Sequence, residues 1–270
     1  MIEREIMLTS ILNCERIDLY LDPKDLSEEE KSRFEAMRER RLSGEPLQYI
    51  IGACDFMGIE LKADARALIP RPETEILADE LIRMAHLKQE RSPEHLRILD
   101  LGTGSGNLAI AAAKNIHNCS LVALDISRDA LTLAQHNAEK NNVCEKIQFV
   151  CEDLVEYLYY SSPQKKFHSI VSNPPYIVTS DLAHLPKDVL HEPRIALDGG
   201  MDGLVFLRAI ISCAYRWLYP LGNLLLEIGD HQAQAVLDLF KTYPYYQNIR
   251  FLEDYTKTKR IVVVERGMHG

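Results

Sequence analysis

An asparagine, two prolines and a tyrosine follow directly on an apolar run in the stretch SIVSNPPYIV, residues 169–178. Proline cannot donate to a sheet ladder, so Pro174 and Pro175 are predicted to end the strand 169–172 abruptly. The residue before a proline is restricted to extended geometry, which places Asn173 on a rigid turn. The Asn173 side chain and the Pro174 carbonyl offer two acceptors for a planar NH₂ group, and Tyr176 offers a flat wall.

A glycine-rich stretch, LDLGTGSGNLAI at residues 99–110, is the second set of candidate residues. It follows a predicted strand and opens a predicted helix, where an open α/β sheet places its ligand crevice. Glycines there permit positive φ and a close approach of the backbone to a ligand. The spacing G-x-G-x-G differs from the dinucleotide pattern G-x-G-x-x-G, which weakens a phosphate-binding interpretation. The predicted binding residues are Gly102, Thr103, Gly104, Ser105 and Gly106.

Two acids at the ends of the next predicted strands extend this pocket. Asp125 could accept hydrogen bonds from both hydroxyls of a ribose. Asp153, or an amide beside it, could meet an adenine edge, with Leu154 as an apolar wall for the ring. The set predicts an adenosine pocket; a glycine-rich turn without any ligand is the alternative.

Asn173 ends the fourth strand beside the same crevice, which links the two sets. If the ligand is S-adenosylmethionine, the acceptor nitrogen must be placed in line with the S–CH₃ bond. An NH₂ group conjugated with a π system is a poor nucleophile, and two acceptors would hold it and bias it towards the pyramidal geometry of attack. A strand stopped by prolines, with a buried tyrosine, is the purely structural alternative.

The elements that must position these residues alternate between strand and helix from Arg97 onwards. This alternation predicts an α/β fold: a Rossmann-like, mostly parallel sheet with helices on both faces. Two final runs, NIRFLE and RIVVVER, are predicted to pair as an antiparallel hairpin. A helical domain is expected at residues 1–51, a β-hairpin linker at 52–73, and the catalytic domain at 74–270. Where the linker meets the catalytic domain, Thr74 or Glu73 is expected near the cap of a helix that follows Pro72.

Composition narrows the class of protein. The 270 residues are 46% apolar and 26% charged, with a formal net charge of −9, which argues against a nonspecific nucleic-acid binder. No run of 18 apolar residues and no signal peptide is evident, so we expect a cytoplasmic protein without membrane contact. The six cysteines form no Cys-x-x-Cys pair and are expected to be reduced core thiols; no metal site is expected.

These motifs together resemble a known family. DLGTGSG, Asp125 and NPPY look like a class I S-adenosylmethionine-dependent methyltransferase, and further stretches are similar to the PrmC/HemK glutamine N5-methyltransferases of peptide-chain release factors. Those stretches are GEPLQYIIG (44–52), LIPRPETE (68–75), EPRIALDGGMDGL (192–204) and LLLEIG (224–229). The resemblance covers nearly the whole chain and is weakest in the first 40 or so residues.

The resemblance implies methyl transfer to the glutamine amide of a Gly-Gly-Gln motif in class I release factors. It assigns Gly102–Gly106, Asp125, Leu154 and Asn173 to the cofactor, and Asn173, Pro174, Pro175 and Tyr176 to the glutamine. Some relatives have an aromatic residue where this chain has Leu154, so aliphatic packing would replace stacking on adenine. The helical domain would then recognise the release factor.

Several interpretations stay open. Arg71 and Glu73 could lie near the methionyl end of the cofactor or form a salt bridge between the domains. Glu192 and Arg194 could line the acceptor site or pair with each other. The main rival function is a DNA or RNA adenine-N6 methyltransferase, which predicts a basic face and a target-recognition domain. A nucleotide-dependent oxidoreductase would leave NPPY unexplained, and a non-catalytic adapter would not require Asn173 and Tyr176.

Overall fold

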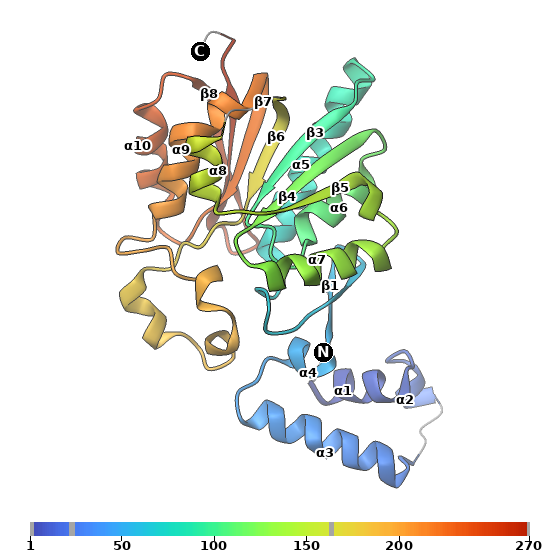
Figure 1. Cartoon of the computed structure of the whole chain (residues 1–270). Coiled ribbons are helices and arrows are strands. Elements are labelled where there is room, and N and C mark those ends of the chain that lie inside the picture. The colour runs from blue at the N-terminus through green and yellow to red at the C-terminus, as the bar shows by residue number, and fades with distance from the viewer. Residues whose placement is uncertain (1–2, 22–24, 162–164, 269–270) are drawn as a thin grey trace.

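A seven-stranded sheet forms the centre of the molecule in a computed structural model that describes residues 3–21, 25–161 and 165–268 (Figure 1). Its strand order is β5-β4-β3-β6-β7-β9-β8. The first five of these strands run parallel, whereas β9 is antiparallel to both β7 and β8. The bounds are β3 Leu96–Leu101, β4 Cys119–Asp125, β5 Ile147–Cys151, β6 Phe167–Ser172, β7 Leu218–Glu227, β8 Tyr246–Glu253 and β9 Lys259–Arg266. The predicted mostly parallel sheet with a C-terminal antiparallel hairpin is confirmed.

Helices cover both faces of this sheet and bury two apolar layers. One layer packs α5 (Pro72–Arg91), α6 (Asn107–Asn115) and α7 (Arg128–Lys140) against the sheet. The other packs α8 (Leu154–Tyr160), α9 (Val205–Trp217) and α10 (Ala233–Lys241) against the opposite face. β6 is buried along its whole length, as expected for a central parallel strand that reads as a continuous apolar run.

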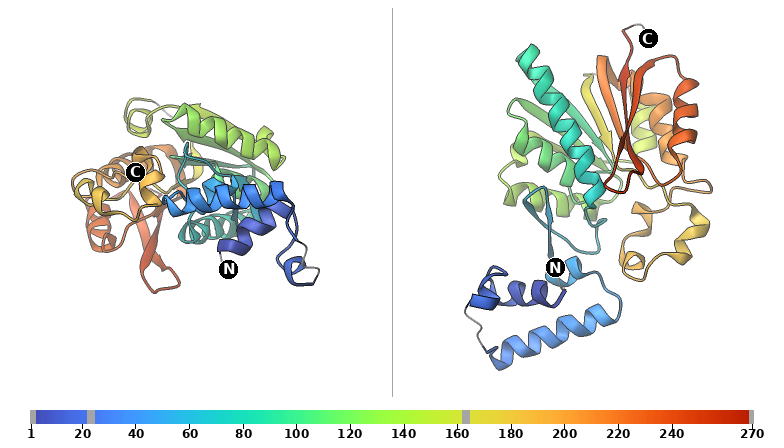
Figure 2. Two further views of the ribbon diagram at one scale, coloured as in Figure 1. Left: turned by 90° about the horizontal axis from the view of Figure 1, so that it is seen from below. Right: turned by 180° about the vertical axis from the view of Figure 1, so that it is seen from behind.

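The N-terminal helices lie beyond the edge of the sheet at which β3 and β6 end (Figures 1 and 2). They are α1 (Glu3–Leu12), α2 (Asp18–Leu21), α3 (Glu28–Leu42) and α4 (Leu47–Ile51). Ser27 and Glu30 form the predicted capping box at the start of α3, a helix that buries none of its residues. The hairpin predicted around Gly58 is present as β1 (Ala53–Phe56) and β2 (Ile59–Lys62).

Two local expectations can be compared with the structure. The N-cap of α5 is Arg71, so Glu73 and Thr74 lie in the first turn, near the cap as expected, although the Thr74 hydroxyl bonds to Glu227 and does not cap the helix. A proline suits the first turn because its missing N–H would have no helical partner there. All six cysteines are unpaired, but only Cys119 and Cys213 are buried and Cys151 is exposed, so the expectation of core thiols holds for two of them.

A long connection joins β6 to α9 and lies on the same side as the N-terminal helices (Figure 1). It contains three short 3₁₀ turns, at Thr179–His184, Val189–His191 and Arg194–Ala196. The connection and the helices touch, since the Arg41 guanidinium lies 3.9 Å from the Asp188 carboxylate. Among the described residues, none of the helices has the length and apolar character needed to cross a bilayer.

Candidate active site

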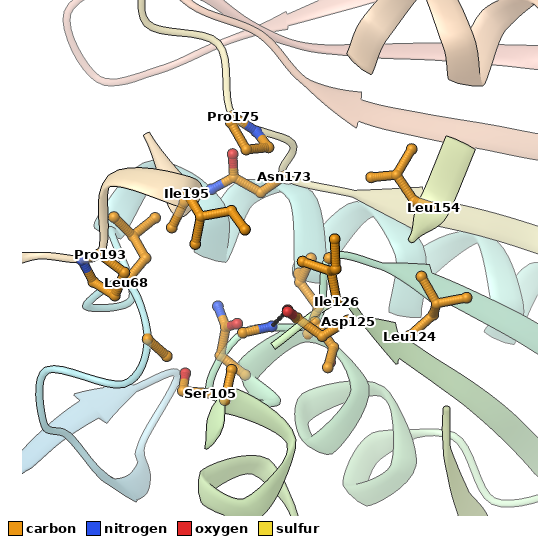
Figure 3. Close-up of a pocket in the computed structure, with 18 of the residues that line it drawn as sticks. Leu68, Ser105, Leu124, Asp125, Ile126, Leu154, Asn173, Pro175, Pro193 and Ile195 are labelled. Carbon is orange, nitrogen blue, oxygen red and sulfur yellow. Dashed lines mark hydrogen bonds between the residues drawn. The ribbon is translucent and has the colours of Figure 1, made fainter. Parts of the chain in front are cut away.

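The predicted site residues gather at the carboxyl ends of β3, β4 and β6. The strand order reverses between β3 and β6, and open α/β sheets bind ligands at such a switch point. A cavity opens there, with Asn173 and Pro175 across from Ser105 and Asp125 (Figure 3). Eight of the predicted residues for the cofactor line it: Gly102, Thr103, Gly104, Ser105, Asp125, Asp153, Leu154 and Asn173.

The glycine-rich turn forms the floor of this cavity. Gly102, Gly104 and Gly106 have φ values of +72°, +55° and +84°, so the predicted left-handed backbone is present at all three. Gly106 does not line the cavity. It is the N-cap of α6, where a Cβ atom would come within 3.1 Å of Ala134 Cβ and Ile110 Cδ1. Glycine at this position lets α6 pack closely on α7.

Asp125 is fixed by the backbone on both sides of its carboxylate. One oxygen accepts from the Gly104 N–H at 2.8 Å, as Figure 3 shows, and the other from the Ser127 N–H at 2.9 Å. Burial raises the pKa of this carboxyl, while the hydrogen bonds from Ser127 and Gly104 act in the opposite direction. Each oxygen keeps a lone pair, so the side chain can still accept two hydroxyl groups.

Asp153 and Leu154 occupy the start of α8. One carboxylate oxygen of Asp153 caps that helix by accepting from the Val155 N–H at 2.7 Å and the Glu156 N–H at 3.1 Å. The Leu154 side chain is buried against the cavity, near Leu124 and Ile126 (Figure 3). This end of the cavity therefore combines an apolar wall with a fixed carboxylate.

A second cavity adjoins the first around Asn173. Pro174 and Tyr176 line only this second cavity, whereas Pro175 lines only the first. Leu68, Arg71 and Ala196 line both, so the turn separates two connected spaces. The four residues of the NPPY motif are thus brought together, with Asn173 at the junction.

Two carbonyl oxygens of this turn accept no hydrogen bond from the described residues. No described residue donates a hydrogen bond to Asn173 Oδ1, and that oxygen is not buried. It is directed towards Pro175 in Figure 3. No described residue donates to the Pro174 carbonyl either. The turn therefore presents a pair of unoccupied acceptors, which is what a planar NH₂ donor requires.

Two residues that the sequence did not assign to the site, Thr74 and Glu227, lie behind the turn. Asn173 Nδ2 donates to Thr74 Oγ1 at 3.1 Å, and Thr74 Oγ1 donates to Glu227 Oε2 at 2.7 Å. The Tyr176 hydroxyl donates to the other Glu227 oxygen at 3.4 Å. Burial raises the pKa of Glu227 to about 7 and that of Tyr176 above its usual range. The signal available in the sequence was an acid ending the buried run LLLE.

The connection after the turn folds back tightly onto it. The Ile177 N–H donates to the Leu197 carbonyl at 3.0 Å, and the Gly199 N–H donates to the Ile177 carbonyl at 2.8 Å. A Cβ atom at Gly199 would lie 2.7 Å from Tyr176 Cα, and one at Gly203 would lie 2.4 Å from the Tyr176 carbonyl oxygen. These glycines allow the returning chain to pass directly against the turn.

Two ion pairs and one backbone hydrogen bond show how the charged residues Arg71, Glu192 and Arg194 are held. The Glu192 side chain is buried, with 1% of its surface exposed. Its carboxylate accepts from the Ile69 N–H at 2.9 Å and pairs with the guanidinium of Arg71. Burial raises the pKa of Glu192, and Arg71 opposes this shift. Arg194 pairs instead with Asp198 at 3.1 Å and is 72% exposed. Arg71 lines both cavities, while Glu73 lines neither.

The chain matches two protein-family models, which together account for most of its length. Residues 2–52 match the PrmC N-terminal domain, and residues 78–200 match the methyltransferase small domain.

Curated relatives match over nearly the whole chain. The release factor glutamine methyltransferase of Geobacter sulfurreducens is 39% identical over 241 residues, which cover 88% of this chain and 80% of the relative. The protein with the same name from Streptococcus pneumoniae is 41% identical over 242 residues, 89% of this chain and 82% of the relative. Among solved structures, a methyltransferase from Pyrococcus furiosus superposes with a TM-score of 0.56 at 16% identity and covers 90% of this chain and 100% of its own. That structural likeness shows the fold.

Proposed function

The chain belongs to the family of release factor glutamine methyltransferases, and on that premise we propose which group it methylates and how. The methyl donor is S-adenosylmethionine, and the acceptor is the side-chain amide nitrogen, N5, of the glutamine in the Gly-Gly-Gln motif of class I release factors. The observation that carries this proposal is the position of Asn173 at the junction of two cavities, where neither its Oδ1 nor the carbonyl oxygen of the adjacent Pro174 accepts a hydrogen bond from the described residues.

The first cavity fits the adenosine of the donor. Asp125 keeps two lone pairs for ribose hydroxyls beside the glycine-rich turn, and Leu154 supplies an apolar surface for the adenine ring. Asp153 is held by the α8 helix start, so its remaining oxygen and the nearby amides can meet the adenine edge. The bound donor supplies an electrophilic methyl group.

The second cavity fits a primary amide. Asn173 Oδ1 and the Pro174 oxygen each accept one N–H of the glutamine NH₂, which fixes the nitrogen and favours its pyramidal form. Pro174 and Pro175 hold these acceptors on a backbone that cannot donate or join the sheet. Tyr176, which lines this cavity, borders the amide plane. Positioning, more than acid–base chemistry, is the contribution of these residues, since the nitrogen becomes acidic only as its new bond forms.

Selectivity for a release factor needs a second surface, because the turn recognises only an amide. The N-terminal helices, described over residues 3–21 and 25–51, are the candidate: α3 touches the β6–α9 connection through Arg41 and Asp188, and the helices carry exposed apolar side chains, Leu21 at 75% and Leu42 at 77% exposure. A protein substrate of this kind also explains an acidic chain with a small helical domain. The rival function, adenine-N6 methylation of DNA or RNA, is not favoured by the relatives, whose curated names specify release factor glutamine.

The proposal is tested by mass spectrometry of a class I release factor incubated with the protein and S-adenosylmethionine. We expect a single added methyl group on the Gly-Gly-Gln glutamine and none on a release factor with asparagine in its place. Methylation of an adenine-containing oligonucleotide, with no methylation of the release factor, would overturn the proposal.

The docking surface is tested by comparing kcat/KM on the intact release factor and on a short Gly-Gly-Gln peptide. Leu21→Glu and Leu42→Glu should lower the value for the intact protein and leave that for the peptide unchanged. Tyr255→Glu, at an equally exposed position in the β8–β9 turn, is the matched control. Equal losses on both substrates would show that the N-terminal residues act within the catalytic pocket instead.

A further inference from the structure

A chain of hydrogen bonds links three segments of the fold behind the turn formed by residues 173–176, called here the acceptor turn. It runs from the Asn173 amide nitrogen to the Thr74 hydroxyl at 3.1 Å, and from that hydroxyl to the Glu227 carboxylate at 2.7 Å. Asn173 follows β6, Thr74 lies in the first turn of α5, and Glu227 ends β7. Thr74 and Glu227 are both buried, with 2% and 1% of their surfaces exposed.

The direction of each bond in this chain is dictated by Glu227. An ionised carboxylate can only accept, so the single proton of the Thr74 hydroxyl must point at Glu227. The Thr74 oxygen can then only accept from Asn173, which obliges the amide NH₂ to face Thr74. The carbonyl oxygen of Asn173 is thereby turned away from Thr74 and left free. With the opposite amide orientation, an NH₂ group would face the glutamine NH₂, and donor would meet donor.

We propose that Glu227 is a positioning residue for methyl transfer, which acts through Thr74 to fix the orientation of the Asn173 amide. This inference rests on the proposed function for the identity of the acceptor. A second branch supports it, because the Tyr176 hydroxyl donates to the other oxygen of the same carboxylate at 3.4 Å. One buried acid thus holds both side chains that face the amide.

Packing alone gives no reason for a carboxylate here. Burying Glu227 disfavours its charged form, and a neutral side chain would avoid that cost. The charged and titratable groups that face it are Glu73 on α5, Tyr176 on the turn and Arg260 on β9. Arg260 is itself paired with Asp254 and Asp230. What the carboxylate supplies and an amide cannot is a group that only accepts hydrogen bonds.

The first test is Glu227→Gln. The new amide can donate to Thr74, which releases the hydroxyl proton towards Asn173 and removes the constraint on its orientation. We expect kcat for release factor methylation to fall at least tenfold. The Kd for S-adenosylmethionine should stay within twofold, and the melting temperature should not fall. Glu80→Gln is the matched control, because Glu80 is also buried but pairs with Arg83 and Arg250 away from the site. It should lose stability and keep its turnover.

The second test separates the hydroxyl proton from the bulk of Thr74. Thr74→Val keeps the shape and removes the relay, so it should lower kcat as much as Glu227→Gln does. Thr74→Ser keeps the hydroxyl and should recover most of the lost turnover. The double variant with Glu227→Gln should be no worse than either single variant, since both break one chain. Additive losses in the double variant would overturn the relay.

The pH dependence of kcat gives a third readout. Burial raises the pKa of Glu227 to about 7, so the wild-type kcat should decline as the pH falls through that value and the carboxylate gains a proton. Glu227→Gln should lack this decline. An identical acidic limb in wild type and variant would contradict the assignment.

A measurement without any acceptor protein distinguishes failure of this inference from failure of the proposed function. The side-chain ¹⁵N–H₂ signal of Asn173, identified by its loss in Asn173→Asp, should shift in Glu227→Gln and Thr74→Val but not in Glu80→Gln. If the signal shifts while wild type leaves release factors unmethylated, the proposed function fails and the relay stands. If wild type methylates release factors while both the signal and kcat are unchanged in Glu227→Gln, the relay is wrong.

Discussion

The two halves of the site differ in how far apart along the chain their bonded partners lie. On the cofactor side, Asp125 binds the Gly104 amide 21 residues away and the Ser127 amide two residues away. On the acceptor side, Thr74 and Glu227 are 153 residues apart, and Ile69 and Glu192 are 123 apart. The cofactor half is thus shaped by the ends of neighbouring strands, whereas the acceptor half depends on tertiary contacts between distant segments. Loss of long-range contacts should therefore impair use of the acceptor before it impairs binding of the cofactor.

Asn173→Ala should produce the largest loss of methylation activity and should separate the contribution of the acceptor half from that of the cofactor half most clearly. It removes one of the two acceptors for the glutamine amide, so we expect kcat to fall on the order of 10²- to 10³-fold, as when one preorganised group at a reacting centre is lost. Asn173→Asp keeps an acceptor oxygen but loses the donor to Thr74, and it should lie in between. Single-turnover methylation measures both. Wild-type rates in Asn173→Ala would rule out the two-acceptor arrangement.

Asp125→Ala probes the other half and should show the opposite pattern. The ribose hydroxyls lose a charged acceptor, worth about 1.5–3 kcal/mol per hydrogen bond, so the affinity for S-adenosylmethionine should fall at least about tenfold. Isothermal titration measures the affinity, and circular dichroism checks the fold. Asp125→Asn, which keeps one acceptor oxygen, should lose less. An unchanged affinity in Asp125→Ala would mean that the ribose lies elsewhere.

Glu192→Gln tests how much a buried long-range ion pair of the acceptor half stabilises the fold, compared with an exposed pair in the same connection. It breaks a buried charge-assisted bond to Arg71, so the free energy of unfolding should fall by about 1.5 kcal/mol and the KM for the release factor should rise. Arg194→Gln breaks an exposed pair in the same connection and should cost below about 1 kcal/mol. Denaturant unfolding of both variants gives the comparison. Equal costs would show that burial of Glu192 contributes nothing.

Each half also holds one buried acid whose pKa burial raises to about 7: Asp100, which binds Thr103 of the glycine-rich turn, and Glu227, which binds Thr74 behind Asn173. An unfolded chain releases these protons at lower pH than the folded chain does. Their contribution to stability is therefore present below about pH 4 and is lost as the pH rises towards 7. Asp100→Asn and Glu227→Gln should each flatten the unfolding free energy between pH 4 and 7, by at most about 1.4 kcal/mol per pH unit. Urea unfolding across this range measures the slopes, and parallel curves for variants and wild type would contradict the assignment.

The contrast between the halves explains what the sequence could predict. Gly102, Gly104, Asp153 and Asn173 follow strands and Asp125 ends one, and the carboxyl ends of parallel strands meet at one edge. Their convergence therefore followed from strand assignments alone, and the sheet with its final hairpin followed from the same alternation.

The partners of the acceptor half could not be predicted in this way. Arg71 pairs with Glu192 across 121 residues, and no local pattern points to that pairing over the two alternatives considered for Glu192 and Arg194, which were to line the acceptor site or to pair with each other. Thr74 lies near the helix cap, as its spacing after Pro72 predicted, but no local pattern indicates that its hydroxyl reaches Glu227. Only the packing of α5 against β7 brings these side chains together.

The close passage of Gly199 and Gly203 against Tyr176 has a consequence for how the acceptor connection is anchored. Both ends of the acceptor connection are tied at its base, through Ile177 with Leu197 and Gly199, and through Thr179 with Gly200 at 2.9 Å. Residues 180–196 thus form an arc that is closed at its base by these bonds and anchored again by Glu192, which is bound to Ile69 and Arg71. The bonds at the base are separate from the Glu192 anchor, so a substitution that loosens Glu192 should leave the backbone of the turn in place.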